Sequence, residues 1–373
     1  MSDTAPAWQP TVAVVGGGYG GVRVAKALDA VADVVLVDPK DAFVHNVAAL
    51  RALVDPRWLP HVYFPYDTLL ARGRVVRDRA VSVDSKRVVL GSGEEIAADY
   101  IVLATGSSYP FPGKSDALET EAAHEHYRAS HRALAAADGV LLLGAGPVGL
   151  ELAGEIRAVW PDKRVTVADI GDDILPGPYR PELRAELRRQ LDELGVELLL
   201  GSPLREAPPT EPGTAATFTV TTEAGTEVTA DIWYRCYGVT PLTGYLADDL
   251  SPALTARRLV EVTPELRVTG QDSVFALGDI TTLGPPMAGH AGMQAEVVAA
   301  NIRALITGEG ELGAYEPMPP VIVVPLGPDR GAGQFPGQED ILDGPAVAQI
   351  KGRSLLVERQ TEVFGGGDKE LPK

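Results

Sequence analysis

Three glycine triplets spaced as GxGxxG are the residues whose types and spacing point most directly to a ligand. Glycine has no Cβ, so a glycine-rich turn lets the backbone approach a pyrophosphate, and a helix that begins there offers free N–H groups and the positive end of its dipole. The chain has 40 glycines in 373 residues, so chance alone gives about 0.5 such triplets. The triplets are Gly16, Gly18 and Gly21; Gly144, Gly146 and Gly149; and Gly308, Gly310 and Gly313.

The sequence around each triplet indicates which of them can bind a dinucleotide. The first two follow short apolar runs and lead into amphipathic segments, residues 22–31 and 150–159, so each predicts a strand, a tight turn and a helix. The third follows a helix-like stretch, residues 295–306, and leads into a proline-rich loop, so we take it as a chance match. Two βαβ units are therefore predicted, one near the start of the sequence and one in its middle.

An aspartate ends the second predicted strand of each unit. Asp38 lies 22 residues after the first glycine of the first triplet, and Asp169 lies 25 residues after that of the second. At such positions a carboxylate accepts hydrogen bonds from the hydroxyls of an adenosine ribose. At Asp169 the carboxylate would also repel the extra phosphate of NADPH, and no arginine follows it directly. If the second unit binds a nicotinamide dinucleotide, it is therefore predicted to prefer NADH over NADPH.

The two halves of the sequence are also similar beyond their glycine turns. Residues 93–106 align with residues 225–238 at a constant offset, sharing a glycine at both ends, a glutamate and an Ala-Asp pair. Each half is therefore predicted to contain a βαβ unit, a hairpin and a return strand. The one cysteine, Cys236, falls on the second return strand opposite Ala104, where a buried apolar cysteine is favoured over a reactive thiol.

Composition and charge narrow the classes of partner. The formal net charge is −18, which repels nucleic acid and anionic lipid. No apolar run is long enough to span a bilayer, and the sequence starts with neither a signal peptide nor a myristoylation motif. We therefore expect a cytoplasmic protein with small-molecule partners and at most weak peripheral membrane contact. Three nearby histidines, His124, His126 and His131, do not share one helix face, so no metal site is predicted.

The two glycine units and three further motifs resemble those of the pyridine-nucleotide-dependent FAD oxidoreductases. The further motifs are an ATG run, a Thr-Pro turn at residues 240–241, and TGQDSVFALGD, which ends in Gly278 and Asp279. The resemblance covers about residues 10–306 and implies FAD in the first unit and NAD(P)H in the second, with Asp279 holding the flavin ribitol. The further cofactor-binding residues that it implies are Ala104, Thr105, Gly106 and Gly238.

A narrower resemblance places the chain near the apoptosis-inducing-factor-like branch that contains the ferroptosis-suppressor quinone reductases, with type II NADH dehydrogenases as more distant relatives. It rests on residues 43–52, 149–156, 325–334 and 350–357. It implies that His45 and Asn46 lie beside the flavin, that Glu151 lies near the nicotinamide and that Lys351 approaches the flavin. A part of the quinone motif is kept at Gln294, whose amide is expected to reach a quinone carbonyl. Purely structural roles stay open for these residues. Glu151 could stabilise its helix, Lys351 could be a solvated surface residue, and His45 and Asn46 could anchor a loop.

The sequence also departs from these relatives. Disulfide reductases of the superfamily carry a cysteine pair beside the flavin, which one cysteine cannot supply, so electrons are expected to leave the flavin directly. The predicted reaction is hydride transfer from NADH to FAD, followed by two-electron reduction of an acceptor, most simply a quinone. Two alternatives stay open, a reductase that passes electrons to a ferredoxin or rubredoxin, and a non-enzymatic NADH-sensing flavoprotein.

The predicted fold is α/β, with two Rossmann-like dinucleotide-binding domains and a small C-terminal α+β segment. The FAD-binding domain is expected to comprise residues 1–111 and 240–318, and the NAD(P)H-binding domain residues 112–239. Residues 319–373 are expected to form the segment that covers the flavin.

Overall fold

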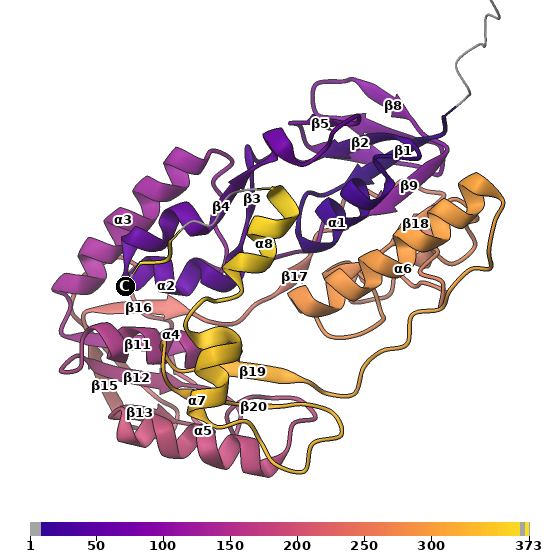
Figure 1. Ribbon diagram of the computed structural model, residues 1–373. Coiled ribbons are helices and arrows are strands. Elements are labelled where there is room, and N and C mark those ends of the chain that lie inside the picture. Colours follow the sequence, from indigo (N-terminus) through magenta and orange to yellow (C-terminus); the bar gives the residue numbers. More distant parts are fainter. Residues whose placement is uncertain (1–8, 366–369, 373) are drawn as a thin grey trace, which may run out of the picture.

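The computed structural model describes residues 9–365 and 370–372 and contains two parallel sheets (Figure 1). The first sheet has five strands in the order β18-β9-β1-β2-β5, all parallel. Its strands are rich in valine, and apart from the edge strand β5 they are almost wholly buried, as is typical of a sheet covered on both faces. They are β1 (Thr11–Val15), β2 (Asp33–Val37), β5 (Arg74–Val76), β9 (Tyr100–Leu103) and β18 (Val274–Ala276).

Helices α1 (Tyr19–Leu28) and α6 (Ala288–Thr307) pack against each other beside this sheet (Figure 1). Gly20 permits the contact, because a Cβ there would lie 2.1 Å from the Cδ1 of Leu277 and 3.2 Å from the carbonyl oxygen of Ala291. Helix α6 ends at Gly308, which has a left-handed backbone conformation. The third glycine triplet is thus a helix end and the loop that follows, as predicted.

The second sheet has four parallel strands in the order β13-β12-β11-β16. The helices of this half are α3, α4 and α5, and both α4 and α5 begin at a proline, a residue suited to the first helical turn. The strands are β11 (Gly139–Leu143), β12 (Arg164–Ala168), β13 (Val196–Leu199) and β16 (Ile232–Arg235), and the helices are α3 (Thr120–Ala136), α4 (Pro147–Val159) and α5 (Pro181–Glu193).

The predicted duplication is confirmed in the hairpins. In the first half β6, β7 and β8 form an antiparallel meander that leads into β9, and in the second half the hairpin of β14 and β15 leads into β16. Both β8 and β9 start at the positions that the sequence alignment pairs with the starts of β15 and β16. The bounds are β6 (Ala80–Val83), β7 (Arg87–Leu90), β8 (Glu95–Ala97), β14 (Phe218–Thr221) and β15 (Glu227–Ala230).

The connection from the first sheet to the second and the connection back lie side by side. Strand β10 (Ser107–Ser108), on the way to the second sheet, pairs antiparallel with β17 (Thr240–Pro241), on the way back. The boundaries predicted near residues 111 and 240 lie close to this pair, and the division of the chain into domains stays a prediction. Between β2 and β5 the chain forms β3 (Ala42–Val44), α2 (Ala49–Val54) and β4 (Tyr63–Pro65).

The C-terminal segment lies against both halves (Figure 1). Its hairpin packs closely on α4, because Gly154 has no Cβ and an added one would lie 2.4 Å from the Cα of Leu326. Its elements are β19 (Ile322–Pro325), β20 (Gly331–Gln334), α7 (Gly344–Val347), a π-helical turn (Ala348–Gly352) and α8 (Val357–Phe364). In the part of the chain that the structure describes, no helix is both long and apolar enough to cross a membrane.

Candidate functional site

The two glycine turns have matching backbone geometry. Gly16 and Gly144 open the turns with φ of +106° and +115°, which side chains of L residues rarely adopt. An added Cβ would lie 2.4 Å from the carbonyl oxygen of Ala104 in the first turn and 2.8 Å from that of Cys236 in the second. Each turn therefore needs glycine at its first position, where it packs against the return strand of its own half.

The other two glycines of each triplet differ in what surrounds them. A Cβ at Gly21 would lie 1.8 Å from the Gly16 oxygen, and one at Gly149 would lie 1.9 Å from the Gly144 oxygen. A Cβ at Gly18 or Gly146 would meet no protein atom within 4 Å. The middle glycine of each turn thus borders open space at the start of α1 or α4, and neither helix has a side-chain N-cap. Both turns fit a pyrophosphate, which needs close backbone approach and free N–H groups.

The two aspartates also occupy matching positions. The Oδ2 atom of Asp38 accepts a hydrogen bond from the Gly17 N–H, and that of Asp169 accepts one from the Ala145 N–H, both at 2.6 Å. Each carboxylate therefore lies next to its glycine turn, as a ribose-binding acid must. Burial raises the pKa of Asp38, and hydrogen bonds from the Lys40 and Gly17 N–H groups oppose that rise. A cavity of about 370 Å³ lies beside Asp38, lined by Pro39, Arg77, Asp78, Arg79 and Leu118.

Asp279 lies in a polar cluster between the two crossings of the chain. It follows β18 in a short 3-10 turn (Gly278–Ile280), and its Oδ2 accepts a hydrogen bond of 2.6 Å from the Ser107 hydroxyl. The Nζ of Lys114 lies 3.5 Å from the same oxygen and donates to the Ser107 carbonyl. Burial lowers the pKa of Lys114, which the Asp279 carboxylate opposes. Sequence reasoning missed Lys114, because no motif marks it.

His45 joins the first half to the C-terminal segment. Its Nε2 lies 2.8 Å from the carbonyl oxygen of Leu355, which only accepts hydrogen bonds, so Nε2 carries the proton. Nδ1 then accepts from the Tyr19 hydroxyl at 3.0 Å, and that hydroxyl accepts from the Val47 N–H. Burial lowers the pKa of His45 to about 4, so the ring is neutral at pH 7. Asn46 begins the adjoining 3-10 turn (Asn46–Ala48) and is half-buried.

The segment that His45 holds has unusual backbone geometry. Leu355 and Leu356 have φ of +51° and +62°, values that cost of order 1 kcal/mol each for residues other than glycine. They follow the π-helical turn (Ala348–Gly352) that carries Lys351. Single π-helical turns occur often at functional sites, because they re-aim one side chain.

Glu151 and Lys351, two predicted site residues 200 positions apart, are in direct contact. The Lys351 Nζ lies 2.7 Å from the Glu151 Oε1, and both side chains are largely buried. Glu151 is in the first turns of α4, immediately after the second glycine triplet. The structure thus places a cation of the C-terminal segment beside the second glycine turn.

A second ion pair lies one helical turn further along α4. Arg51 of α2 makes a two-point contact with Glu155, and both side chains are buried. Arg51 also donates from Nη2 to the Gly352 carbonyl oxygen at 2.8 Å. Burial raises the pKa of Glu155, and the guanidinium of Arg51 opposes the rise. Arg51 therefore links the first half to the second half and to the residue after Lys351. Sequence reasoning missed Arg51 because its partners are distant in the chain.

Gln294 corrects the prediction that its amide meets a quinone. Its Oε1 accepts from the Gly278 N–H at 2.6 Å, and its Nε2 donates to the Leu283 carbonyl oxygen at 2.6 Å. The Tyr315 hydroxyl is a further partner, and the residue is only 1% exposed. Its amide is therefore engaged within the protein, and Gln294 holds the turn before Asp279 instead of contacting an acceptor.

The remaining predicted residues lie at the ends of β9, β16 and β18. The Thr105 hydroxyl donates to the Leu242 carbonyl oxygen at 2.6 Å and lies 3.0 Å from the Tyr245 hydroxyl. Ala104 supplies the carbonyl that packs on the first glycine turn. Gly106, Gly238 and Gly278 all have positive φ, of +64°, +103° and +77°.

Cys236 is buried, and burial raises the pKa of its thiol to about 12. The prediction that Cys236 is buried is confirmed. Among the residues that the structure describes, no group of three or more His, Cys, Asp or Glu side chains could hold a metal ion.

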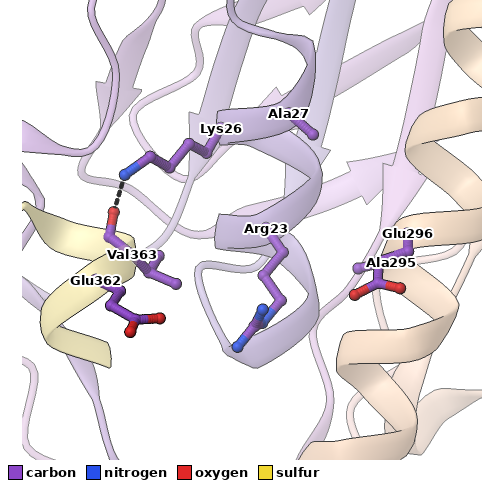
Figure 2. Close-up of a pocket in the computed structure, with 7 residues that line it drawn as sticks. All are labelled: Arg23, Lys26, Ala27, Ala295, Glu296, Glu362 and Val363. Atoms are coloured by element: carbon purple, nitrogen blue, oxygen red, sulfur yellow. Dashed lines mark hydrogen bonds between the residues drawn. The ribbon is translucent and has the colours of Figure 1, made fainter. Parts of the chain in front are cut away.

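A cavity of about 340 Å³ lies between α1, α6 and α8 (Figure 2). Figure 2 shows basic side chains on the α1 side and acidic ones on α6 and α8, with the Lys26 Nζ bonded to the carbonyl oxygen of Val363. This bond and one from the Thr68 hydroxyl to the Phe364 carbonyl hold the end of α8 on the first half. The lining residues are Arg23, Lys26, Ala27, Ala295, Glu296, Glu362 and Val363.

Comparison with known proteins identifies the family. Residues 10–295 match the family described as pyridine nucleotide-disulphide oxidoreductase. Ferroptosis suppressor protein 1 of Taeniopygia guttata is 32% identical over 362 residues, which cover 95% of each chain. Apoptosis-inducing factor homolog B of Dictyostelium discoideum is 28% identical over 371 residues, covering 93% of this chain and 95% of the relative.

A solved structure extends the likeness to the fold. NDH2 of Plasmodium falciparum, solved in complex with NADH, superposes with a TM-score of 0.70 at 11% identity, covering 96% of this chain and 99% of that one. The resemblance inferred from the sequence motifs is confirmed by these matches, as is the α/β fold with two dinucleotide-binding units. The chain belongs to the pyridine nucleotide-disulphide oxidoreductase family, in the branch that contains the ferroptosis suppressor and apoptosis-inducing-factor-like proteins.

Proposed function

We propose that this FAD-dependent pyridine nucleotide oxidoreductase oxidises NADH and reduces a quinone-type acceptor. The family supports the cofactor and the nucleotide class. When bound, FAD supplies the chemistry that links the two substrates, because it takes up a hydride from nicotinamide and gives up both electrons. The residues proposed to hold it are the first glycine turn, Asp38 and Asp279, and the second glycine turn and Asp169 are proposed to hold the nucleotide.

The contact between Glu151 and Lys351 is the observation that carries this proposal. A nucleotide with its pyrophosphate at the start of α4 lies next to Glu151, and Lys351 is 2.7 Å from that carboxylate. A cation held there can stabilise negative charge that develops during electron transfer. The two-point Arg51–Glu155 contact and the Arg51 bond to Gly352 fix the segment that carries the lysine.

The cysteine content restricts the class of acceptor. The one cysteine in the sequence is buried, so no pair of thiols relays electrons, and the acceptor has to receive them from the cofactor itself. We propose that it approaches from the side of α6 and the C-terminal segment. The cavity between α1, α6 and α8 supports that direction of approach (Figure 2). Its charged lining favours an acceptor with a polar head group over a wholly apolar one.

The preference for NADH is a further part of the proposal. Asp169 accepts hydrogen bonds at the end of β12, and the residue after it, Ile170, is exposed and uncharged. Neither side chain favours the additional phosphate of NADPH. A cytoplasmic site of action also belongs to the proposal.

Substitution of Lys351 tests the oxidative half-reaction. We expect Lys351→Ala to slow NADH:quinone turnover by about 10- to 100-fold, with FAD content and anaerobic reduction by NADH nearly unchanged in stopped-flow measurements. Lys86→Ala, an exposed lysine on β6-β7, is the control. Because Lys351→Ala leaves Glu151 without its partner, the double variant Glu151→Gln/Lys351→Ala separates loss of the cation from excess negative charge. Equal slowing of both half-reactions would instead place Lys351 in cofactor or nucleotide binding.

An acceptor screen on the purified protein separates the proposal from its two rivals. Rapid reoxidation by soluble quinones supports the proposal. Rapid reoxidation only by a ferredoxin or rubredoxin identifies an electron-transfer reductase, although the net charge of −18 disfavours acidic partners. Slow reoxidation by every acceptor identifies a protein that senses NADH.

A further inference from the structure

The chain that leaves β16 presents an unusual run of exposed residues. Positions 237–240 are all exposed, beginning with Tyr237 at 55% and including Val239 at 46%. In the first half the position that aligns with Tyr237 is Thr105, which is half-buried and bonded to the Leu242 carbonyl. The two halves therefore share the return strand but differ at the residue after it. The first half has a small, hydrogen-bonded residue there, and the second half has a large, exposed aromatic residue.

The order of strands in the second sheet shows what lies at this place. Strand β11 has β12 on one side and β16 on the other, so the point where the strand order reverses lies between β11 and β16. Ligands of open α/β sheets bind beyond the carboxyl ends of the strands at such a point. Cys236 borders the second glycine turn directly, since an added Cβ on Gly144 would lie 2.8 Å from its carbonyl oxygen. Tyr237 is therefore the first residue past the turn on the β16 side.

The direction of a bound dinucleotide follows from the same order. Asp169 ends β12 and would hold the adenosine ribose, and the start of α4 would hold the pyrophosphate. A dinucleotide that runs from β12 across β11 carries its nicotinamide half toward β16. We propose that Tyr237 is a substrate-binding residue whose ring packs against the nicotinamide riboside half of the nucleotide.

The surroundings of Tyr237 favour a contact made by its ring. The Arg235 guanidinium lies 6.0 Å from the centre of its ring, and the residue is 55% exposed, so most of the ring is accessible. Tyr237 also lies on the connection to β17, whose partner β10 contains Ser107, the residue bonded to Asp279. A ring at this point would hold the nicotinamide on the side of the sheet that faces the first half.

This inference rests on the proposed nucleotide site. Binding measurements with two ligands distinguish a failure of the inference from a failure of the site. NAD⁺ has both halves of the dinucleotide, whereas ADP-ribose lacks the nicotinamide. We expect Tyr237→Thr, which restores the residue of the first half, to weaken NAD⁺ binding about three- to tenfold and to change ADP-ribose binding less than about twofold. Tyr237→Phe keeps the ring and should bind both ligands like the unmodified protein. Calorimetric titration of the FAD-loaded protein measures all of these.

Two controls complete the experiment. Val81→Thr removes an exposed apolar side chain from the β6 meander and should change neither affinity. Asp169→Asn should weaken both ligands, because both contain the adenosine ribose. If Tyr237→Thr lowers the affinity for both ligands equally, the proposed role of Tyr237 is overturned. It is also overturned if Tyr237→Thr lowers neither affinity while Asp169→Asn lowers both. Neither outcome contradicts the nucleotide site itself. Failure of the unmodified protein to bind either ligand overturns the proposed nucleotide site and the inference with it.

Discussion

The two dinucleotide-binding units have the same turns but different surroundings. In both, the first glycine packs on the return strand, the middle one borders open space and the aspartate accepts from the turn. Beyond the turns the first unit is covered, since Thr105 is bonded to the chain at Leu242 and Pro39 is half-buried. In the second unit the equivalent positions carry Tyr237 at 55% and Ile170 at 78% exposure.

We propose that this difference separates a retained ligand in the first unit from an exchanged one in the second. A cofactor that stays bound benefits from elements that close over it, and a substrate that leaves in every cycle needs an open edge. The first unit gains its cover from the connection at β17 and from helix α8, which is tied to it by Lys26 and Thr68. In the proposed assignment, similar turns serve two roles because the elements around them differ.

The largest expected effect comes from a methyl group on the middle glycines. Gly18→Ala and Gly146→Ala meet no protein atom, so both proteins should fold, but each methyl projects toward the pyrophosphate. We expect Gly18→Ala to lower FAD retention and Gly146→Ala to leave one FAD per chain while raising the KM for NADH, each by roughly 30-fold or more. Flavin absorbance and steady-state kinetics measure the two effects. Loss of FAD from the Gly146 variant would contradict the assignment of the two units.

A smaller effect is expected from the aspartates. Asp169→Asn removes the charge that disfavours NADPH, so the ratio of kcat/KM for NADH over NADPH should fall about tenfold. The matched change, Asp38→Asn, should affect FAD affinity and leave that ratio unchanged. An unmodified protein that uses NADPH as well as NADH would show that Asp169 does not face the ribose.

The features that the sequence predicted well are those encoded locally. Glycine turns, the apolar strands before them and the amphipathic helices after them have short-range patterns, and the repeat at residues 93–106 and 225–238 doubled that information. The burial of Cys236 followed from its place on a return strand. These patterns are visible because each depends on residues close together in the chain.

The side-chain partners could not be predicted in the same way. Lys114 near Asp279, and Arg51 between Glu155 and Gly352, depend on contacts between residues more than 100 positions apart. Gln294 shows the reverse error, because its place in a family motif indicated an acceptor contact, whereas its partners are backbone groups around Asp279 and the Tyr315 hydroxyl. Periodicity and motif spacing carry no information on such hydrogen bonds.

Near neutral pH the smallest expected effect concerns His45, which links the first unit to the C-terminal segment. Burial holds its pKa at about 4 instead of 6.5, so the unfolded chain binds a proton in this range that the folded protein does not. Its contribution to stability is complete above pH 6.5 and is lost as the pH falls toward 4. We expect a loss of about 1 kcal/mol at pH 6, rising to roughly 3 kcal/mol at pH 4.

Denaturant unfolding at several pH values measures this contribution. His45→Gln should be less stable at pH 7.5, because it loses the bonds to Tyr19 and Leu355, but its free energy of unfolding should fall less steeply between pH 6.5 and pH 5. Parallel curves for the two proteins would show that His45 is not the group that titrates.

The pairing of β10 with β17 has a consequence for protein engineering. Residues 109–239 leave and rejoin the first half through two hydrogen-bonded strands, whose backbones are only about 5 Å apart. Because the two ends of this segment are adjacent, it is suited to replacement. A different nucleotide-binding module could be inserted between Ser108 and Thr240 without changing the distance between the ends that the first half has to join. The graft would have to retain acids in place of Glu151 and Glu155, because otherwise Lys351 and the buried Arg51 would lose their counter-ions.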